Sequence, residues 1–297
     1  MQLGIGLEFA REMNVGFEEA ARLSVDAGYR YIEPFVHAPA SLRLNSHLAV
    51  EFASEYHHLN TAQVDRVQTI SLMQRLDLSF CAFDAHSSLL LPQVGAPYVI
   101  AAIDFAAEVN CPIVMSDEGP VPTEWMDLNR AFDLMCLTLE RIVAHAQEHG
   151  VQFAIELHNA LTTQSRFLKL LLQRFGPQDL GINFDTGNSF LAGNDPLELL
   201  DQIADRVVHV HVKDIPESML HLRGNVTGTR VGVAAGDGVV DLAGILSRLH
   251  AENYQGVLSV ECDTFDQAVQ SRLYLERLID ALSPAALPHL VVPGSQL

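Results

Sequence analysis

The sequence predicts a single (β/α)8 barrel. Short apolar runs typical of strands alternate with amphipathic helical patterns along the 297 residues, and eight such pairs follow one another. Eight strand–helix pairs in a chain of this length are typical of this barrel. A doubly wound sheet is the alternative fold, but it usually has a glycine-rich phosphate-binding loop after an early strand. The sequence has no such loop there.

The expected elements follow one another in a regular order. Strands are expected where short runs rich in apolar residues occur, at residues 3–7, 31–34, 78–83, 112–115, 152–156, 181–185, 207–212 and 257–261. Helices are expected where apolar residues recur with helical spacing, at residues 17–27, 63–76, 98–109, 128–149, 162–174, 196–204, 242–252 and 265–282. Gly28 and Gly150 follow two of these helices, and Asp195 and Pro196 are typical of an N-cap and a first helical residue.

Two connections are longer than ordinary loops, at residues 35–59 and 215–239. Both follow predicted strands, and this is the side on which such barrels build active sites. We interpret residues 1–297 as one domain, in which residues 283–297 form a C-terminal tail.

Composition limits the possible partners and the compartment. The formal net charge of −19 repels phosphate backbones and anionic lipid surfaces, so neither nucleic acid nor a membrane is an expected partner. No apolar run approaches the roughly 18 residues of a membrane span. The N-terminus lacks the basic start of a signal peptide, and the four cysteines have no CxxC spacing. We therefore expect a cytoplasmic protein with reduced thiols.

Four consecutive predicted strands, the last four of the chain, carry a metal-ligand side chain at or near their ends. These side chains are Glu156, Asp185, His211 and Glu261. Carboxylates with one imidazole suit a hard or borderline divalent cation such as Mn²⁺, Mg²⁺, Co²⁺ or Zn²⁺. Unpaired charges that converge at a barrel mouth are costly unless a cation or a ligand neutralises them. The pattern therefore predicts a site for one divalent metal ion.

The alternation of side chains along these strands supports the same interpretation. Successive residues of a strand point to opposite faces, so Glu156 shares a face with Ala154, while Phe153 and Ile155 point to the other. His211 likewise shares its face with His209. Small or polar residues inward and bulky apolar residues outward are typical of a barrel mouth.

With these residues, the chain resembles the xylose isomerase-like barrels, which include sugar phosphate isomerases and epimerases, ketose 3-epimerases, hydroxypyruvate isomerase, inosose dehydratase and endonuclease IV. The matching segments are ELH at 156–158, DTGN at 185–188, HVHVKD at 209–214, GDGVVD at 236–241 and YQGVLSVE at 254–261. They cover the last four strand–helix units. In the first half of the chain, Glu33 also resembles the acid of the family's second strand.

The resemblance implies one divalent cation, most simply Mn²⁺, held by Glu156, Asp185, His211 and Glu261. It further implies a metal-dependent isomerase or epimerase of a sugar or keto-sugar, with Glu156 and Glu261 as catalytic residues on opposite sides of the substrate. One removes a proton α to a carbonyl and the other returns a proton to the metal-stabilised enediolate. A positioned base and charge stabilisation at the oxyanion are what such a carbon acid needs.

Six further residues are assigned to substrate binding, mainly by the same resemblance. These are Glu33, His86, His158, Asn188, Lys213 and Arg223. Lys213 could instead pair with Asp214 or a neighbouring acid, and Arg223 or Arg230 could contact an acidic group of the substrate. Two positions depart from the ketose 3-epimerases, which have histidine in the place of Asn188 and arginine in the place of Glu217.

These departures leave other activities open. The first is a metal-dependent lyase or dehydratase acting on a keto-glycoside or an inosose, which starts with the same proton abstraction. Endonuclease activity would need a basic DNA-binding face, which the net charge disfavours. A non-catalytic sugar-binding barrel is a further alternative. The resemblance also implies a homodimer or a homotetramer, as is common in the family.

Overall fold

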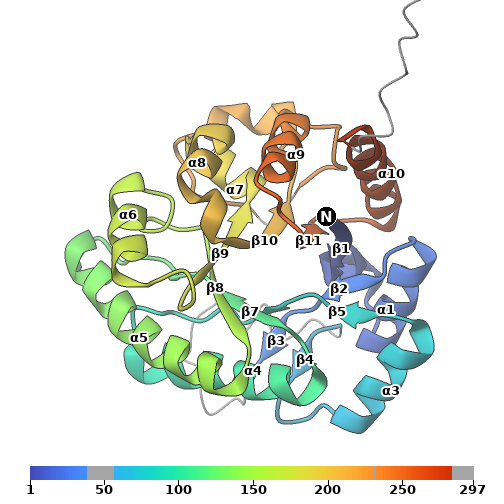
Figure 1. Cartoon of the computed structure of the whole chain (residues 1–297), viewed down its shortest axis with the longest axis horizontal. Coiled ribbons are helices and arrows are strands. Elements are labelled where there is room, and N and C mark those ends of the chain that lie inside the picture. Colours follow the sequence, from blue (N-terminus) through green and yellow to red (C-terminus); the bar gives the residue numbers. More distant parts are fainter. Residues whose placement is uncertain (39–56, 230–231, 283–297) are drawn as a thin grey trace, which may run out of the picture.

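The computed structural model describes residues 1–38, 57–229 and 232–282. Within these residues nine short parallel strands form one sheet that curves into a ring, and helices lie around the outside of this ring (Figure 1). The strands are β1 (Gln2–Gly6), β2 (Tyr31–Glu33), β5 (Ser79–Phe80), β6 (Phe83–Asp84), β7 (Ile113–Ser116), β8 (Gln152–Glu156), β9 (Gly181–Asp185), β10 (Val207–Val212) and β11 (Val257–Val260).

The third barrel strand is divided into two pieces, whereas one strand over 78–83 was predicted. β5 pairs with β2 on one side, and β6 pairs with β7 on the other. The backbone N–H of Asp84 donates to the carbonyl of Pro34 at 3.2 Å, and a parallel bridge joins Phe35 to Asp84. These contacts connect β6 to the end of β2, so the order β5-β2-β1-β11-β10-β9-β8-β7-β6 describes a nearly closed barrel. The predicted (β/α)8 class is therefore confirmed.

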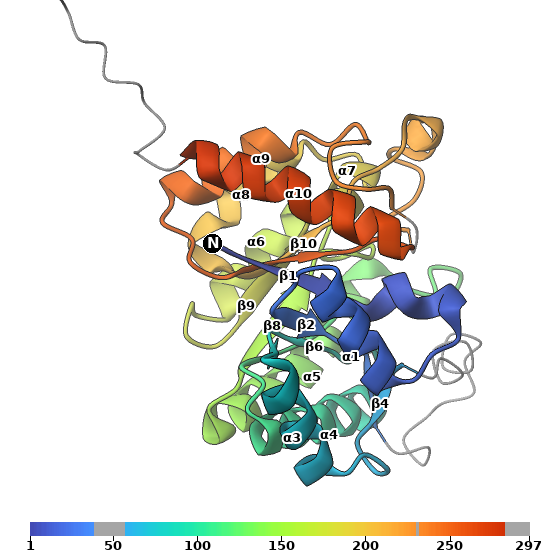
Figure 2. The same ribbon diagram turned by 90° about the vertical axis from the view of Figure 1, so that its right-hand side faces the viewer.

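The helices follow the strands as the sequence predicts and cover their outer face (Figure 2). They are α1 (Phe17–Asp26), α3 (Arg66–Leu76), α4 (Pro92–Val109), α5 (Leu128–His149), α6 (Ser165–Arg174), α8 (Pro196–Ile203), α9 (Leu242–Ala251) and α10 (Phe265–Leu282). α4 begins six residues before the predicted start, with Pro92 in its first turn. The Asp195 side chain caps α8 by accepting from the N–H groups of Leu197 and Glu198.

Short elements that were not predicted lie in the connections. They are the 3₁₀ helices η1 (Leu7–Met13), η3 (Ala204–Arg206) and η4 (Glu217–Leu222), the helix α7 (Thr186–Leu191), and a separate pair of strands, β3 (Val36–His37) and β4 (Leu59–Asn60). All six residues of α7 are buried, so no apolar–polar period marks this helix in the sequence. The predicted tail, 283–297, lies outside the described residues.

Side chains of β8 point alternately to two apolar clusters, one outside and one inside the barrel, as the sequence predicts. Phe153 and Ile155 of β8 belong to the large apolar core between the strands and the helices. Ala154, between them, faces inward and packs with Ala82 and Met115 in a small separate cluster. The inner layer is thus thin and apolar below the polar side chains at the carboxyl ends of the strands. None of the described helices is long and apolar enough to cross a membrane.

Arg206 joins the base of β9 to the start of β10. Its side chain is buried, and one guanidinium nitrogen, Nη2, donates to the carbonyls of Phe175, Gly176 and Leu180 at 2.9 Å each. These bonds satisfy backbone carbonyls at the turn that leads into β9. They therefore help to fix the position of β9 and of Asp185, its last residue.

We predict that Arg206→Met lowers the free energy of unfolding by about 2–4 kcal/mol, because buried carbonyls lose a charged donor. Urea denaturation would measure the loss. Arg174→Met is the control, since Arg174 forms an exposed ion pair with Glu140. Its loss should stay below about 1 kcal/mol. Equal losses in the two variants would show that the Arg206 bonds do not stabilise the barrel.

Candidate active site

His211 lies at the centre of the candidate site. β10 directs its ring into the barrel, where it is fully buried. Its Nδ1 atom is 3.1 Å from Glu261 Oε1, 3.8 Å from Glu156 Oε1 and 3.9 Å from Asp185 Oδ2. The structure therefore brings together the four side chains that the sequence predicts as metal ligands, each from the end of a different strand.

The opposite edge of the His211 ring is held by Glu33. The two oxygens of Glu33 lie 2.7 Å from His209 Nε2 and 2.7 Å from His211 Nε2. Burial opposes ionisation of Glu33, but His211 and His209 outweigh it and lower its pKa. In neutral His211 this bond places the proton on Nε2, so the lone pair of Nδ1 accepts from Asn183 Nδ2 at 3.1 Å, on the edge of the ring that Glu156, Asp185 and Glu261 approach. Both oxygens of Glu33 are engaged in these bonds, so its predicted contact with a substrate stays a prediction.

Lys213 provides positive charge between two of the carboxylates. Its Nζ atom forms an ion pair with Glu261 and lies 3.1 Å from Asp185 Oδ2. Burial disfavours the ammonium, but Asp185 and Glu261 outweigh this effect and raise the pKa of Lys213. The sequence left Asp214 or a neighbouring acid as possible partners of Lys213, and the structure shows Asp185 and Glu261. The side chain of Asp214 instead accepts hydrogen bonds from the backbone N–H groups of Ile215, Gly236, Gly238 and Val240. It thus holds the long loop after β10, called the seventh loop below.

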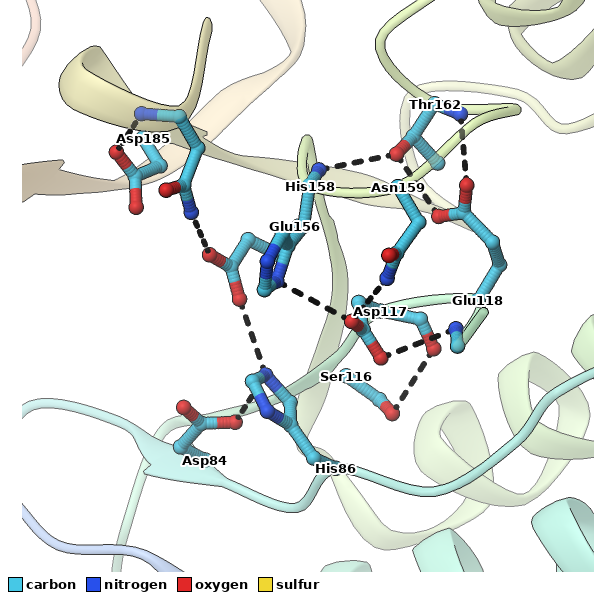
Figure 3. Close-up of polar contacts among 12 residues, drawn as sticks. Asp84, His86, Ser116, Asp117, Glu118, Glu156, His158, Asn159, Thr162 and Asp185 are labelled. Atoms are coloured by element: carbon cyan, nitrogen blue, oxygen red, sulfur yellow. Dashed lines mark hydrogen bonds and ion pairs between the residues drawn. The ribbon is translucent and has the colours of Figure 1, made fainter. Parts of the chain in front are cut away.

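Glu156 is positioned by two of the residues predicted to bind substrate. Asn188 Nδ2 donates to its Oε1 at 3.1 Å. His86 Nε2 lies 3.0 Å from its Oε2 (Figure 3). His86 Nε2 is also 2.9 Å from Asp84 Oδ1. Burial raises the pKa of Asp84 to about 6, while Asp84 and Asp117 raise that of His86 against the effect of burial. Burial also opposes ionisation of Glu156, but the neighbouring imidazoles of His211 and His86 prevail and lower its pKa.

His158 lies beside these groups, in the loop that follows β8. Its Nδ1 atom is 3.2 Å from Asp117 Oδ2, and Asn159 donates to the same oxygen (Figure 3). Burial lowers the pKa of His158, but the bond to Asp117 outweighs it, and the result is a pKa of about 9. His158 and His86 are therefore two imidazoles that favour the protonated form within one acidic mouth.

A second acid of the β7 loop anchors this arrangement. Glu118 is fully buried and accepts from the N–H of Leu161 at 2.7 Å. It also accepts from the N–H of Thr162 at 3.2 Å and from the Thr162 hydroxyl at 2.9 Å (Figure 3). Thr162 Oγ1 in turn accepts from the N–H of His158 at 3.1 Å. Glu118 thus holds the loop that carries His158.

Sequence reasoning missed several acids of the site. Asp84 ends β6, Asp117 and Glu118 follow β7, and Glu8 follows β1. Burial, followed by repulsion from Glu261, raises the pKa of Glu8 to about 8. All four acids lie at or just after the end of a strand, which is the criterion that identified the ligand set. Applied to the first half of the chain, the same criterion would have found them.

Arg223 contacts an aromatic ring and two backbone carbonyls in the described structure. Its guanidinium lies over the ring of Phe190 at 4.4 Å and donates to the carbonyls of Phe190 and Asn194. These contacts attach the seventh loop to the end of α7. Its binding to a substrate stays a prediction, and Arg230 lies outside the described residues.

The geometry around His211 fits a divalent cation. With metal–ligand bonds of about 2.1 Å, neighbouring donors lie about 3 Å apart and opposite donors about 4.2 Å apart. The three separations from His211 Nδ1 fall between about these values. Glu156, Asp185 and His211 form one of the groups in the described structure whose donor atoms are close enough for a metal. Three carboxylates and one imidazole suit Mn²⁺, Mg²⁺, Co²⁺ or Zn²⁺.

A family model and several known proteins match the sequence of this chain. A sequence model of the xylose isomerase-like TIM barrel family matches residues 21–282. The chain is 26% identical over 211 residues to inosose dehydratase of Geobacillus thermodenitrificans, covering 65% of this chain and 68% of that protein. It is 28% identical over 154 residues to inosose dehydratase of Lacticaseibacillus casei, covering 46% and 51%. The matches thus span about half to two thirds of the length of these relatives.

Solved structures show the same fold. A D-tagatose 3-epimerase-like protein superposes with a TM-score of 0.75 at 17% identity, covering 97% of this chain and 100% of that one. L-ribulose 3-epimerase gives 0.72 at 15% identity, covering 95% of each chain. The IOLI protein with a bound zinc atom gives 0.73 at 15% identity, covering 96% and 100%. At these identities the likeness concerns the fold.

Glu118 generates a prediction about pH. Burial, followed by repulsion from Asp117, raises its pKa from 4.5 to about 7. Because the folded pKa is the higher one, this group stabilises the fold fully below about pH 4.5 and loses that contribution as the pH rises through about 7. Glu118→Gln removes the titration. Denaturation between pH 4.5 and 7.5 should therefore show the wild type losing stability relative to this variant. A constant difference across the range would contradict the shift.

Proposed function

The chain belongs to the xylose isomerase-like TIM barrel family, and from this premise we propose that it is a divalent-metal-dependent isomerase or epimerase of a sugar or keto-sugar. The observation that supports this proposal most directly is the convergence of Glu156 Oε1 and Glu261 Oε1 on His211 Nδ1, beside Asp185. Two carboxylates on either side of one cation position provide a base and an acid for a substrate bound between them.

The proton-transfer step follows from the surroundings of the two glutamates. Glu156 is ionised and fixed by Asn188 and His86, so it can accept a proton from the carbon next to a carbonyl. Glu261 Oε1 lies 3.1 Å from His211 Nδ1 and the side chain pairs with Lys213, so we infer that Glu261 exchanges a proton at the opposite face of the substrate. A cation bound by Glu156, Asp185, His211 and Glu261 would supply positive charge where negative charge develops on the substrate oxygens.

The remaining polar groups suit a polyhydroxylated substrate. Lys213 Nζ lies at Asp185 and Glu261, His86 Nε2 at Glu156 and His158 Nδ1 at Asp117. Asn188 adds an amide that donates to Glu156. Carbohydrate hydroxyl groups can both donate to the carboxylates and accept from these N–H groups. We therefore infer a small carbohydrate as the substrate. The homo-oligomer and the cytoplasmic location stay predictions.

A dehydratase is the second candidate, and two observations favour it. The curated relatives quoted above are inosose dehydratases. In addition, His86 and His158 favour the protonated form, so either could donate a proton to a hydroxyl group that leaves from the carbon next to the abstraction site. Isomerisation and dehydration would share the first step, and they would differ in whether a proton is returned or water is lost.

The test is exchange of solvent deuterium into a panel of ketoses, keto-sugars and inososes. Metal-free protein would be loaded with Mn²⁺ and mixed with each compound in D₂O, and the compound would be followed by NMR. Deuterium next to a carbonyl in an isomer or epimer would support the main proposal, whereas an enone or dione product would support dehydration. Absence of exchange with every compound, in protein shown to bind one metal equivalent, would count against both enzymes.

We predict that Glu156→Gln and Glu261→Gln each reduce turnover by about 10²–10⁴-fold, because each removes one positioned acid–base group. The matched control is Glu140→Gln on the exposed side of α5, where Glu140 pairs with Arg174. Its turnover should equal that of the wild type. Activity above about one per cent in either site variant would argue against two acid–base groups.

We further predict that Glu33→Gln weakens Mn²⁺ binding by about 10–100-fold, because the carboxylate that orients the His211 ring is lost. Calorimetric titration of the metal-free protein would measure the affinity, again with Glu140→Gln as the control. Unchanged affinity in Glu33→Gln would mean that the strand alone orients His211.

A further inference from the structure

A second group of metal-binding side chains lies on the outside of the barrel. Asp104 projects from α4, and His145 and His149 project from the last two turns of α5. These two helices pack against each other (Figure 1). The carboxyl end of α5 leads into the start of β8, so this cluster lies toward the end of the barrel opposite Glu156. The proposed function makes no use of it.

Both histidines approach the same oxygen of Asp104. Asp104 Oδ1 is 2.6 Å from His145 Nε2 and 3.6 Å from His149 Nε2. Donor atoms around a tetrahedral Zn²⁺ lie about 3.3 Å apart, so the two separations lie on either side of the required value. The two rings are stacked with centroids 4.1 Å apart, because residues four apart on a helix lie on one face. The cluster is one of the groups in the described structure whose donor atoms could hold a metal.

The backbone prepares one of the imidazoles for a metal. His149 Nδ1 lies 2.9 Å from the carbonyl oxygen of His145. A carbonyl only accepts, so Nδ1 carries the proton, and in the neutral ring the lone pair is on Nε2. This nitrogen is the one that faces Asp104. A hydrogen bond from the other ring nitrogen is the usual way in which proteins orient a metal-binding histidine.

Exposure and donor type indicate which ion would bind. The side chains of His145, His149 and Asp104 are 24%, 37% and 49% exposed, so an ion and a water ligand can approach directly from solvent. Two imidazoles and one carboxylate suit Zn²⁺, Ni²⁺ or Cu²⁺ rather than Mg²⁺ or Ca²⁺. Binding would displace the proton through which His145 now contacts Asp104.

We propose that Asp104, His145 and His149 form a second metal site, which takes a borderline divalent ion such as Zn²⁺ and links α4 to α5. The ion contacts side chains of both helices, so it binds the folded chain in preference to the unfolded one. It therefore stabilises the barrel at the end opposite the candidate active site. This site is independent of the one around His211.

The test is the number of Zn²⁺ equivalents bound by metal-free protein, measured by calorimetry. His145→Ala and His149→Ala are compared with the wild type and with His250→Ala, which removes an exposed histidine from the end of α9. We expect the wild type and His250→Ala to bind one equivalent more than either α5 variant. Stoichiometry in either α5 variant equal to that of the wild type would overturn the proposal.

Thermal unfolding provides a second measurement that does not depend on the site around His211. Zn²⁺ should raise the melting temperature of the wild type and of His250→Ala by more than that of His149→Ala. Circular dichroism without metal would show that all variants are folded, as expected for exposed positions. An equal rise in all proteins would assign the whole effect to other sites and would also overturn the proposal.

Discussion

The paired hydrogen bonds between Glu33 and the two histidines of β10 are the interaction on which the candidate site depends. They join β2 to β10 across the barrel, between residues 176 and 178 positions apart in the chain. The same bonds leave Nδ1 of His211 directed at Glu156, Asp185 and Glu261. Without a fixed ring at the centre, Glu156, Asp185 and Glu261 would lose the imidazole that all three approach, and their mutual repulsion would oppose folding of the barrel mouth.

Asp185 combines a structural role with its place in the candidate site. Asp185 Oδ1 caps α7 by accepting from the N–H of Asn188 at 2.8 Å, while Oδ2 faces Lys213 and His211. The cap fixes the carboxylate and, through the start of α7, also positions the Asn188 side chain on Glu156. Asp214 and Glu118 have a structural role, because their oxygens accept from backbone N–H groups of loops and, at Glu118, also from the Thr162 hydroxyl. The many acids of this chain therefore do not all belong to one chemical centre.

The fold by itself leaves the reaction open, since barrels of one family carry different chemistries on the same strand ends. What narrows the choice is the arrangement of acid–base groups around one carbon position. In the proposed function Glu156 and Glu261 exchange protons at two faces of the substrate, and His86 and His158, whose pKa values are raised, lie near Glu156. Proton return from a glutamate to the substrate carbon would give the isomer or epimer, whereas proton donation from a histidine to a hydroxyl group would lead to loss of water.

The sequence alone determined the barrel and predicted the four side chains that converge at its mouth. Strands 152–156, 181–185 and 207–212 were predicted with their observed bounds, because fully buried strands leave strong local patterns of apolar residues. Glu156, Asp185, His211 and Glu261 could be grouped because parallel strands of a barrel all end on one face. The division of the third strand and the six-residue α7 were not predicted, since the first depends on barrel closure and the second is buried on every side. Only the tertiary structure decided that Glu33 binds two imidazoles, that Lys213 pairs with Asp185 and Glu261, and that Arg223 packs on Phe190. These choices are made between charges far apart in the chain, and the free energy of each pairing depends on burial and distance, which no local pattern encodes.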